Sequence, residues 1–389
     1  MLKKLAIIST HPIQYNAPLF AMLSSRRKLE VKVFYTWGYE VLEKKYDPGF
    51  NRNVEWDIPL LDNYEYVFVE NVAKHKGSHH FRGIDNPALI NIITQWGAHA
   101  VLVYGWSFKS HLKAIRYFSG KIPVFFRGDS TSLNVPKGII SLIRNIFLRW
   151  IYHHVDICFY VGTHNKNYFK EQRVKGNQLV FAPHAIDNKR FENDIQSKEN
   201  QITKWKHDLG IALYDIVLLY AGKLDYNKNI LLLAEVFCSL KISGLHLIIA
   251  GHGIVEKELK SLYAGKSNIH FLPFQNQSQM PVLYGLCDIF VLPSLSETWG
   301  LSINEAMACG KAVLASSACG AATDLVKEGV NGYIFKSNDS NDLKLKLYML
   351  SHHKSELEEM GLKSKEIIGQ WNFENSCIAI EELLSNQVQ

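Results

Sequence analysis

The sequence lacks any run of about 18 uncharged apolar residues, the length that a membrane-spanning helix needs. Its first residues, Met1-Leu-Lys-Lys followed by Leu5 to Ile8, are too short for a signal peptide and lead straight into a strand pattern. We therefore expect a protein that stays in the cytoplasm, where the inner face of the cytoplasmic membrane is within its reach.

Cysteine is scarce, and no two of the six residues have the C-x-x-C spacing of a zinc or redox site. Several of them lie in apolar runs, where a thiol behaves as a small hydrophobic group. We expect buried free thiols rather than disulfides or metal ligands. The six residues are Cys158, Cys238, Cys287, Cys309, Cys319 and Cys377.

Several catalytic motifs are also missing. No aspartate pair has the D-x-D spacing, and this absence favours a reaction that needs no metal. G-x-S-x-G, H-E-x-x-H and the phosphate loop G-x-x-x-x-G-K-[ST] are absent, so hydrolase, metalloprotease and phosphate-loop mechanisms lack their residues. The first strand-to-helix turn, THPIQYNAP, lacks G-x-G-x-x-G, which disfavours a dehydrogenase. We expect no metal and no cofactor.

The positive charge is concentrated in the first half of the chain. Residues 1–185 carry 24 Lys and Arg against 13 Asp and Glu, a net charge of +11, whereas the remainder carries 19 against 24, a net charge of −5. The basic half should meet an anionic partner: a membrane surface, a phosphate-bearing acceptor or nucleic acid. We find no RNA-binding signature and no helix-turn-helix pattern, so nucleic acid is not an expected partner.

The 389 residues exceed what one core usually serves, so two domains are expected. Each half alternates apolar strand runs with helical patterns, which predicts an α/β fold of two doubly wound Rossmann-like domains facing across a cleft. We place the first domain at 1–187 and the second at 202–370. The polar segment between them, 187–201, is interpreted as a hinge, and 371–389 as a helix that crosses back to the first domain.

The expected strands are short, buried and parallel. In the first half they are 5–9, 31–35, 101–104, 124–126, 157–161 and 179–182; in the second half they are 216–220, 245–250, 268–272, 289–292 and 312–316.

The most informative stretch runs from Pro293 to Gly332. The loop that follows strand 289–292 carries Glu297, and Ser302-Ile-Asn-Glu305 has the spacing of a capping box that opens a short helix. Two carboxylates would then lie at the carboxyl edge of a parallel sheet, where ligands bind. The alternative is that Glu305 only caps the helix and Glu297 is only solvated.

This stretch resembles the E-x7-E signature of retaining glycosyltransferases of family 4. The resemblance rests on Glu297 and Glu305, on PSLSETWGLSINEAMACGKAVLAS around them, and on LVKEGVNGYIF further on. It implies the GT-B fold and metal-independent transfer of a sugar, with retention, from a UDP- or GDP-sugar to a hydroxyl of a growing cell-surface glycan. UDP is favoured over GDP. The acceptor would be lipid-linked, as in the synthesis of lipopolysaccharide or capsule, and the enzyme a peripheral membrane protein.

The same resemblance implies roles for individual residues. Glu297 would hold sugar hydroxyls and favour the positive charge at the anomeric centre, Lys223 and Lys228 would bind the diphosphate, and Glu305 would hold the ribose. A departing nucleoside diphosphate develops negative charge, which cations can stabilise. The further nucleotide contacts expected are Gly222, Phe274, Gly300 and Leu301.

Candidates in the first half concern the transferred sugar or the acceptor. His11 and Gln14 lie on the first strand-to-helix loop, where a turn-stabilising His-Pro is the alternative. Many relatives carry a histidine near the end of strand 124–126, whereas Arg127 and Asp129 stand here. A guanidinium and a carboxylate at this position predict a ligand contact or a mutual salt bridge.

Three other segments have features that bear on function. The polar, aromatic segment Asp47–Tyr66 is expected to be an insertion that faces the acceptor. His75, His79 and His80 are expected in a solvated loop rather than at a metal. The basic amphipathic segment Gly138–His154 is either a buried helix or one that lies on a membrane.

Three other functions stay open from the sequence. An epimerase of the same fold would bind a nucleotide sugar without needing an acceptor. A catalytically idle GT-B scaffold would be expected to have lost Glu297 or the lysines, and both are present. A basic nucleic-acid or membrane-surface binder would depend on charge alone.

Overall fold

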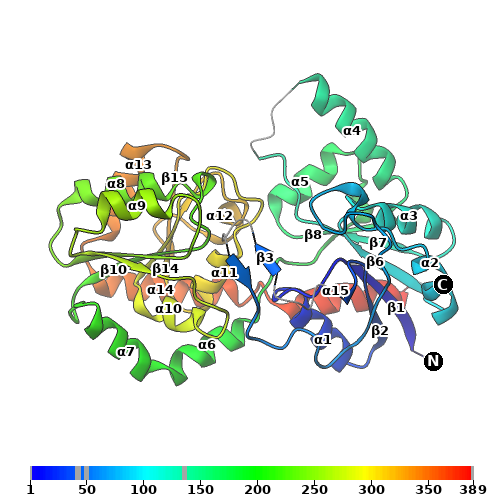
Figure 1. Ribbon diagram of the computed structural model, residues 1–389, viewed down its shortest axis with the longest axis horizontal. Coiled ribbons are helices and arrows are strands. Elements are labelled where there is room, and N and C mark those ends of the chain that lie inside the picture. Colours follow the sequence, from blue (N-terminus) through cyan, green and yellow to red (C-terminus); the bar gives the residue numbers. More distant parts are fainter. Residues whose placement is uncertain (1, 40–44, 48–51, 134–137, 387–389) are drawn as a thin grey trace. The chain divides into compact units, whose positions relative to one another are not determined.

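The computed structural model describes residues 2–39, 45–47, 52–133 and 138–386, and it divides the chain into two compact units (Figure 1). Unit 1 consists of Met1–Lys44, Pro59–Pro183 and Phe373–Gln389. Unit 2 consists of Lys45–Ile58 and His184–Asn372.

Unit 1 is built on a seven-stranded sheet whose strands all run parallel, in the order β5-β2-β1-β6-β7-β8-β9. The strands are β1 Lys3–Ser9, β2 Leu29–Tyr35, β5 Glu65–Phe68, β6 Ala100–Tyr104, β7 Val124–Arg127, β8 Ile157–Tyr160 and β9 Leu179–Phe181. The helices are α1 Ala17–Ser25, α2 Leu89–Trp96, α3 Lys109–Phe118, α4 Ile139–Tyr152, α5 Thr163–Glu171 and α15 Phe373–Asn386, with short 3-10 turns η2 Phe81–Gly83 and η3 Gly176–Gln178. Central strands are apolar throughout because helices cover both faces of such a sheet.

Unit 2 repeats this plan with a six-stranded parallel sheet in the order β12-β11-β10-β13-β14-β15. The strands are β10 Ile216–Ala221, β11 Leu245–Ala250, β12 Ile269–Leu272, β13 Ile289–Leu292, β14 Ala312–Ser316 and β15 Gly332–Phe335. The helices are α6 Asn188–Ser197, α7 Glu199–Asp208, η4 Tyr226–Lys228, α8 Ile230–Leu240, α9 Glu256–Tyr263, α10 Met280–Leu286, α11 Leu301–Ala308, α12 Gly320–Leu325, α13 Ser340–Leu350 and α14 Lys354–Ile368. The prediction of two doubly wound α/β halves is confirmed.

The segment interpreted as a hinge is helical. Residues 187–201 lie largely in α6 and α7, which pack on α10 within unit 2. Asp187 caps α6 by accepting the N–H of Arg190 at 3.1 Å, and Phe191 is buried against the ring of Tyr284. The polar composition belongs to the solvent faces of two amphipathic helices, and the chain changes units earlier, between Pro183 and His184.

Part of the expected insertion at Asp47–Tyr66 folds with unit 2. Strands β3 Lys45–Asp47 and β4 Arg52–Val54 form an antiparallel hairpin, while residues 48–51 lie outside the described part of the chain. The hairpin is followed by Asp57, whose carboxylate accepts the backbone N–H of Ser278 at 3.0 Å and also its hydroxyl. From Pro59 onward the chain belongs to unit 1.

The last helix, α15, lies beside α1 and belongs to unit 1 (Figure 1). Arg26, at the end of α1, donates two hydrogen bonds to the carboxylate of Glu381, at 2.7 and 3.0 Å. Glu381 is 3% exposed, and its hydrogen bonds raise the pKa of Arg26 above the usual range. A buried carboxylate thus has a guanidinium partner that matches its geometry.

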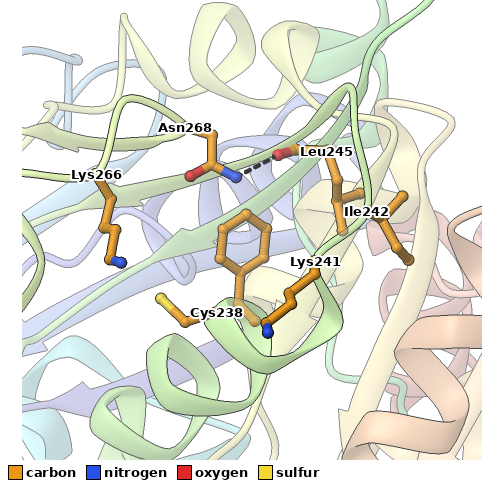
Figure 2. A pocket seen from close by; sticks show the side chains of 7 residues that line it. Cys238, Lys241, Ile242, Leu245, Lys266 and Asn268 are labelled. Carbon is orange, nitrogen blue, oxygen red and sulfur yellow. Dashed lines mark hydrogen bonds between the residues drawn. The ribbon is translucent and has the colours of Figure 1, made fainter.

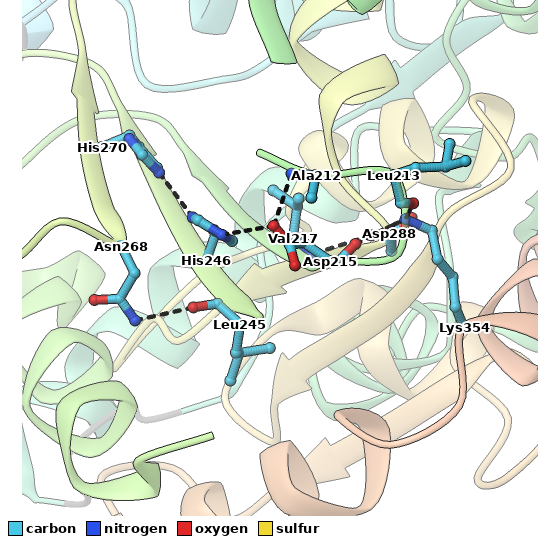
Figure 3. A network of polar contacts seen from close by, with 10 residues as sticks. All are labelled: Ala212, Leu213, Asp215, Val217, Leu245, His246, Asn268, His270, Asp288 and Lys354. Atoms are coloured by element: carbon cyan, nitrogen blue, oxygen red, sulfur yellow. Dashed lines mark hydrogen bonds and ion pairs between the residues drawn. The ribbon is translucent and has the colours of Figure 1, made fainter. Parts of the chain in front are cut away.

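The amino ends of the unit 2 strands carry a polar network, drawn in Figure 3. The imidazole of His246 lies 3.0 Å from that of His270 and 3.1 Å from a carboxylate oxygen of Asp215. Lys354 donates to the carbonyl oxygens of Leu213 and Asp215 at 2.9 and 2.7 Å. These contacts tie the strand starts together at the edge of the sheet opposite to its carboxyl ends.

A hollow of about 190 Å³ lies at the same amino edge, beside the end of α8 (Figure 2). The residues that line it are Phe237, Cys238, Lys241, Ile242, Leu245, Lys266 and Asn268. All six cysteines are free thiols, as predicted, and all except the partly exposed Cys238 are buried.

Candidate active site

The carboxyl ends of β10 and β13 meet where the strand order of unit 2 reverses. From β10 the sheet continues to β11 and β12 on one side, and from β13 to β14 and β15 on the other. In open parallel sheets ligands bind outside the carboxyl ends of the strands at this position. The loops 222–229 and 293–300 follow these two strands and form the candidate site.

An ion pair between Lys228 and Glu297 joins the two loops. Their side chains are 20% and 21% exposed, so the pair is accessible from solvent. The backbones are tied as well: Leu295 donates its N–H to the carbonyl of Asn227 at 2.7 Å, and the Asn227 amide donates to the carbonyl of Ser296 at 2.8 Å. The structure therefore brings together a residue assigned to the diphosphate and one assigned to the sugar.

The loop after β10 has a fixed backbone. The Asp225 carboxylate accepts the N–H of Lys228 at 3.0 Å and caps η4, and Asn229 follows with a φ of +53°. The carbonyl of Lys223 accepts the hydroxyl of Tyr220 at 2.5 Å. Both lysines predicted to bind a diphosphate thus lie on one short loop at the carboxyl end of β10.

Close packing of this loop explains three glycines. A Cβ on Gly251 would lie 1.9 Å from the carbonyl oxygen of Gly222, and one on Gly253 would lie 2.2 Å from that of Leu224. Gly222 and Gly253 both have a φ of +158°, and Gly251 one of +145°, a region that side chains disfavour. The G-x-G after β11 therefore lets its loop press against the loop that carries the lysines.

Helix α11 begins directly after the loop of Glu297. Gly300 is its N-cap with a φ of +100°, and a Cβ there would lie 2.9 Å from a methyl carbon of Leu292. Leu301 is the first helical residue, so Ser302 already lies inside the helix. The predicted capping box of Ser302 and Glu305 is therefore wrong: the left-handed glycine turn starts the helix two residues before a serine cap would.

Glu305 is buried on the inner side of α11, with 2% of its surface exposed. The hydroxyl of Tyr284, from α10, donates to one carboxylate oxygen at 2.7 Å. The role of Glu305 in holding a ribose stays a prediction.

Phe274 lies on the loop 273–279 that follows β12, and this loop is braced from two elements of unit 2. Arg190 of α6 donates to the backbone and side-chain carbonyls of Gln277 at 2.9 and 2.8 Å. The Asn276 amide donates to the carbonyl of Glu55, just after the β3–β4 hairpin, at 2.6 Å. The contact of Phe274 with a nucleobase stays a prediction.

Arg127 has a structural task that the sequence did not indicate. It is 6% exposed and donates to the carbonyl oxygens of Ala182 and Pro183, at 2.9 Å each. Burial lowers its pKa. These contacts anchor the chain where β9 ends. A ligand contact of Arg127 or Asp129, or a salt bridge between them, stays a prediction.

His11 and Gln14 lie on the loop between β1 and α1, and β1 and β6 mark the reversal of strand order in unit 1. Nδ1 of His11 lies 2.9 Å from the hydroxyl of Thr10, and its ring meets that of Trp37 edge-on at 5.0 Å. Both residues are thus at the ligand edge of unit 1, and their contact with a sugar stays a prediction.

His111 was missed by the sequence analysis. It is fully buried on α3, where Nδ1 donates to the carbonyls of Gly105 and Tyr104 at 2.9 and 3.1 Å, and Nε2 accepts from the Thr36 hydroxyl at 2.8 Å. Burial lowers its pKa to about 4, so the ring is neutral. It joins the loops after β2 and β6 at the carboxyl edge. Its signal in the sequence is only one histidine on the buried face of an amphipathic helix.

No cluster of three or more His, Cys, Asp or Glu side chains within the described ranges could hold a metal ion. The charged groups on the loops after β10 and β13 are Lys223, Lys228, Glu297 and Asp225, which caps η4. Lysines can pair with a phosphate, and a carboxylate can accept hydrogen bonds from the hydroxyls of a sugar.

Residues 201–366 match the family model "Glycosyl transferases group 1". Among relatives, the lipopolysaccharide 1,2-N-acetylglucosaminetransferase of Salmonella typhimurium is 28% identical over 232 residues, which are 56% of this chain and 59% of that protein. A Campylobacter jejuni enzyme, N,N'-diacetylbacillosaminyl-diphospho-undecaprenol alpha-1,3-N-acetylgalactosaminyltransferase, is 24% identical over 58% of each chain. This chain thus spans little more than half the length of these two relatives.

Solved structures resemble the whole chain. Sucrose-phosphate synthase from Thermosynechococcus elongatus has a TM-score of 0.75 at 17% identity and covers 99% of both chains. Anabaena HepE in complex with UDP has a TM-score of 0.73 at 17% identity and covers 99% of this chain and 100% of its own. The chain therefore has the GT-B fold of two Rossmann-like halves, and its residues 201–366 match the glycosyl transferases of group 1.

Proposed function

We propose that this protein is a retaining, metal-independent glycosyltransferase that moves a sugar from a nucleotide-sugar donor to a hydroxyl of a growing cell-surface glycan. The observation that carries the proposal is the Lys228–Glu297 pair at the reversal point of the unit 2 sheet. A cation for the leaving diphosphate and a carboxylate for the sugar stand in contact there. The match of residues 201–366 to group 1 supports the same activity.

Each charged group has a task in this reaction. Lys223 and Lys228 stabilise the negative charge that develops on the departing diphosphate. The amino end of α11 adds a partial positive charge beside them. Glu297 accepts hydrogen bonds from sugar hydroxyls and favours the positive charge at the anomeric carbon, and a diphosphate oxygen takes the proton of the acceptor.

The donor that we propose is a UDP-sugar. HepE, whose fold this chain shares, is described in complex with UDP, with UDP and glucose, and with UDP-glucose. The acceptor that we propose is a lipid-linked glycan, since the Campylobacter jejuni relative is named for a diphospho-undecaprenol sugar and the Salmonella relative for lipopolysaccharide.

We further propose that unit 1 rests on the inner face of the cytoplasmic membrane through α4. Within the described chain, no helix is both long enough and apolar enough to cross a bilayer. However, α4 exposes a stripe of apolar side chains: Ile139, Leu142, Ile143, Ile146, Phe147 and Trp150, which are 40–79% exposed.

The charges around this stripe indicate an anionic lipid surface. The sequence of α4 contains two arginines, Arg144 and Arg149, and no acidic residue, and the guanidinium of Arg116 from α3 lies 5.3 Å from the Trp150 ring. On the other side of the helix, Leu148 and Ile151 are completely buried. The helix therefore has one side in the core of unit 1 and one apolar side with basic neighbours, the pattern of an interfacial helix.

A thermal-shift screen followed by a transfer assay tests the activity. UDP and UDP-sugars should raise the melting temperature, because a ligand that binds only the folded state stabilises it. Transfer of labelled sugar should require both donor and acceptor. Isomerised donor in the absence of acceptor would instead identify an epimerase, and no shift with any nucleotide or nucleotide sugar would contradict the proposal.

A further inference from the structure

A hollow of about 690 Å³ lies in unit 1, between the loop 72–85 and the start of α3. The residues that line it are Val72, Ala73, Lys74, His75, His80, Phe81, Arg82, Asp85 and Lys109. We propose that it binds the phosphate-bearing sugar of the acceptor. This inference rests on the proposed glycosyltransferase function and names the part of unit 1 that recognises the acceptor.

The hollow lies at the carboxyl edge of the unit 1 sheet. Residues 72–85 belong to the connection from the carboxyl end of β5 to α2, and Lys109 is the first residue of α3, which follows β6. In a parallel sheet the connections that leave the carboxyl ends of the strands share one edge. The hollow is therefore on the same edge as the loop of His11 and Gln14.

The loop around the hollow has a fixed backbone shape. Asn71 is 2% exposed, and its side-chain amide donates to the carbonyl of Gly83 at 2.9 Å. Its side-chain oxygen accepts the backbone N–H groups of Ala73 and Asp85, at 3.1 and 2.9 Å. Gly77 donates its N–H to the carbonyl of Gly83 at 3.1 Å. These hydrogen bonds hold the beginning of the loop, at Asn71, against its end, at Gly83 and Asp85.

Its glycines and a second asparagine are part of the same construction. A Cβ on Gly83 would lie 2.0 Å from the carbonyl oxygen of Gly77, so only glycine permits this approach. Asn86, which is 4% exposed, donates to the carbonyls of Thr36, Val69 and Glu70 at 2.9–3.0 Å. The loop was expected to be merely solvated; its histidines are indeed exposed, but its backbone is braced from within.

The charge of the hollow is positive. Lys74, Arg82 and Lys109 carry three positive charges and are joined by two imidazoles, His75 and His80. Asp85 is the one acidic side chain among the lining residues, and it is paired with Lys109 at 2.6 Å. Arg82 and Lys74 remain as the cations with which a phosphate would pair, and a guanidinium can hold two phosphate oxygens at once.

The apolar part of the hollow suits a sugar ring. Phe81 is 42% exposed and Val72 is 52% exposed, so the hollow combines cations with an aromatic face. An inorganic phosphate alone would fill little of 690 Å³, whereas ligand sites of about 300–1,000 Å³ hold molecules of the size of a sugar phosphate. The phosphate can belong to a free sugar phosphate or to a sugar diphosphate attached to a lipid.

Titration calorimetry with glucose 1-phosphate and with glucose tests the site. The full chain should bind the phosphate ester, and Lys74→Gln with Arg82→Gln should weaken that binding at least tenfold. Lys170→Gln with Lys175→Gln, which removes two exposed cations elsewhere in unit 1, is the matched control and should bind as the unchanged chain does. Equal binding of glucose, or full binding by the Lys74/Arg82 variant, would overturn the proposal.

Two further arms separate the possible failures. An N-acetylglucosaminyl diphosphate on a short isoprenoid, presented in detergent, should compete with glucose 1-phosphate if the acceptor is lipid-linked; without competition, the phosphate belongs to a free sugar. The UDP thermal shift should be the same in the Lys74/Arg82 variant. If UDP does not raise the melting temperature of the unchanged chain, the proposed function is contradicted. If UDP does raise it but binding of glucose 1-phosphate is the same without Lys74 and Arg82, only the proposed phosphate site is contradicted.

Discussion

Glu297 is the side chain on which the proposed chemistry depends most directly. If its carboxylate makes a charged hydrogen bond in the transition state, replacing it removes about 1.5–3 kcal/mol, which corresponds to about ten- to a hundredfold in rate. We expect Glu297→Gln to lower kcat by that factor while the UDP thermal shift is retained. A folded variant with full activity would contradict the assignment.

Lys228 gives a second prediction because it touches Glu297. Lys228→Ala should lower kcat by about ten- to a hundredfold as well, since the diphosphate loses a cation. Residues in direct contact do not contribute independently. We therefore expect the double variant to lose less than the product of the two single losses. The double variant Lys223→Ala with Glu297→Gln serves as a comparison within the same site. If the losses of Lys228→Ala and Glu297→Gln simply multiply in their double variant, the two residues are not coupled.

His111 predicts how stability depends on pH. Its pKa is about 4 in the folded chain against the usual 6.5, so below pH 6.5 the unfolded state binds the proton more readily. Stability is then lost progressively as the pH falls from 6.5 toward 4, by on the order of 3 kcal/mol in total. Urea unfolding at several pH values should show a shallower loss for His111→Gln than for the unchanged chain. The exposed His153→Gln is the control, and equal pH slopes for all three would contradict the prediction.

The residues of the site were predictable to different degrees. Glu297 and Lys228 were assigned through the resemblance to family 4 glycosyltransferases, yet their contact could not be predicted, since 69 residues separate them. The structural contacts of Arg127 were not predictable, because the carbonyls that hold it belong to the backbone of Ala182 and Pro183, which gives no signal in the sequence. His111 escaped because the loops it joins become neighbours only in the folded sheet.

At the scale of elements, α4 makes the clearest prediction. Sedimentation with phosphatidylglycerol vesicles should carry the protein down, and phosphatidylcholine vesicles should do so less. Ile143 and Ile146 are 64% and 60% exposed, and burying one such side chain is worth about 1.5–3 kcal/mol. Ile143→Glu with Ile146→Glu should weaken vesicle binding at least tenfold.

The matched control for α4 lies in unit 2. Leu345 on α13 and Leu362 on α14 are 56% and 68% exposed, so changing both to glutamate adds the same charge and removes similar apolar surface. This control should bind vesicles as the unchanged chain does. Equal losses in both variants would mean that net charge, and not the apolar stripe of α4, determines the binding.

Elements were easier to predict than their limits. Strands such as β13 and β14 were placed correctly because buried parallel strands are apolar runs that end at Pro, Gly or polar residues. Segment 187–201 was misread because its two helices turn polar faces to solvent. The start of α11 was misplaced because glycine and serine both occur at N-caps, so the sequence offers Gly300 and Ser302, and the structure has the cap at Gly300.

At the scale of the whole molecule, the two units interleave along the chain. The sequence predicted two consecutive halves and a returning helix, whereas unit 1 takes three segments and unit 2 two. The exchange at 45–58 could not be foreseen, because the hairpin is fixed to unit 2 by contacts of Glu55 and Asp57 with residues about 220 positions away. A boundary at one linker therefore does not describe this chain.

We expect the stability of unit 1 to depend on its last segment, α15. The helix contributes Phe373, Cys377, Ile380 and Leu384, all at most 5% exposed, and the carboxylate that pairs with Arg26. At about 1.5–3 kcal/mol for each large apolar side chain, its removal rivals the 5–15 kcal/mol by which whole domains are stable. In a chain that ends at Asn372, hydrogen exchange should be fast in β1, β2 and β6 and remain slow in β10 and β13. Equal protection of both sheets in the shortened chain would show that unit 1 folds without its last segment.

A point substitution in the full-length chain tests the same dependence. Ile380→Ala should destabilise unit 1 by about 2–5 kcal/mol, whereas the exposed Glu382→Ala should not.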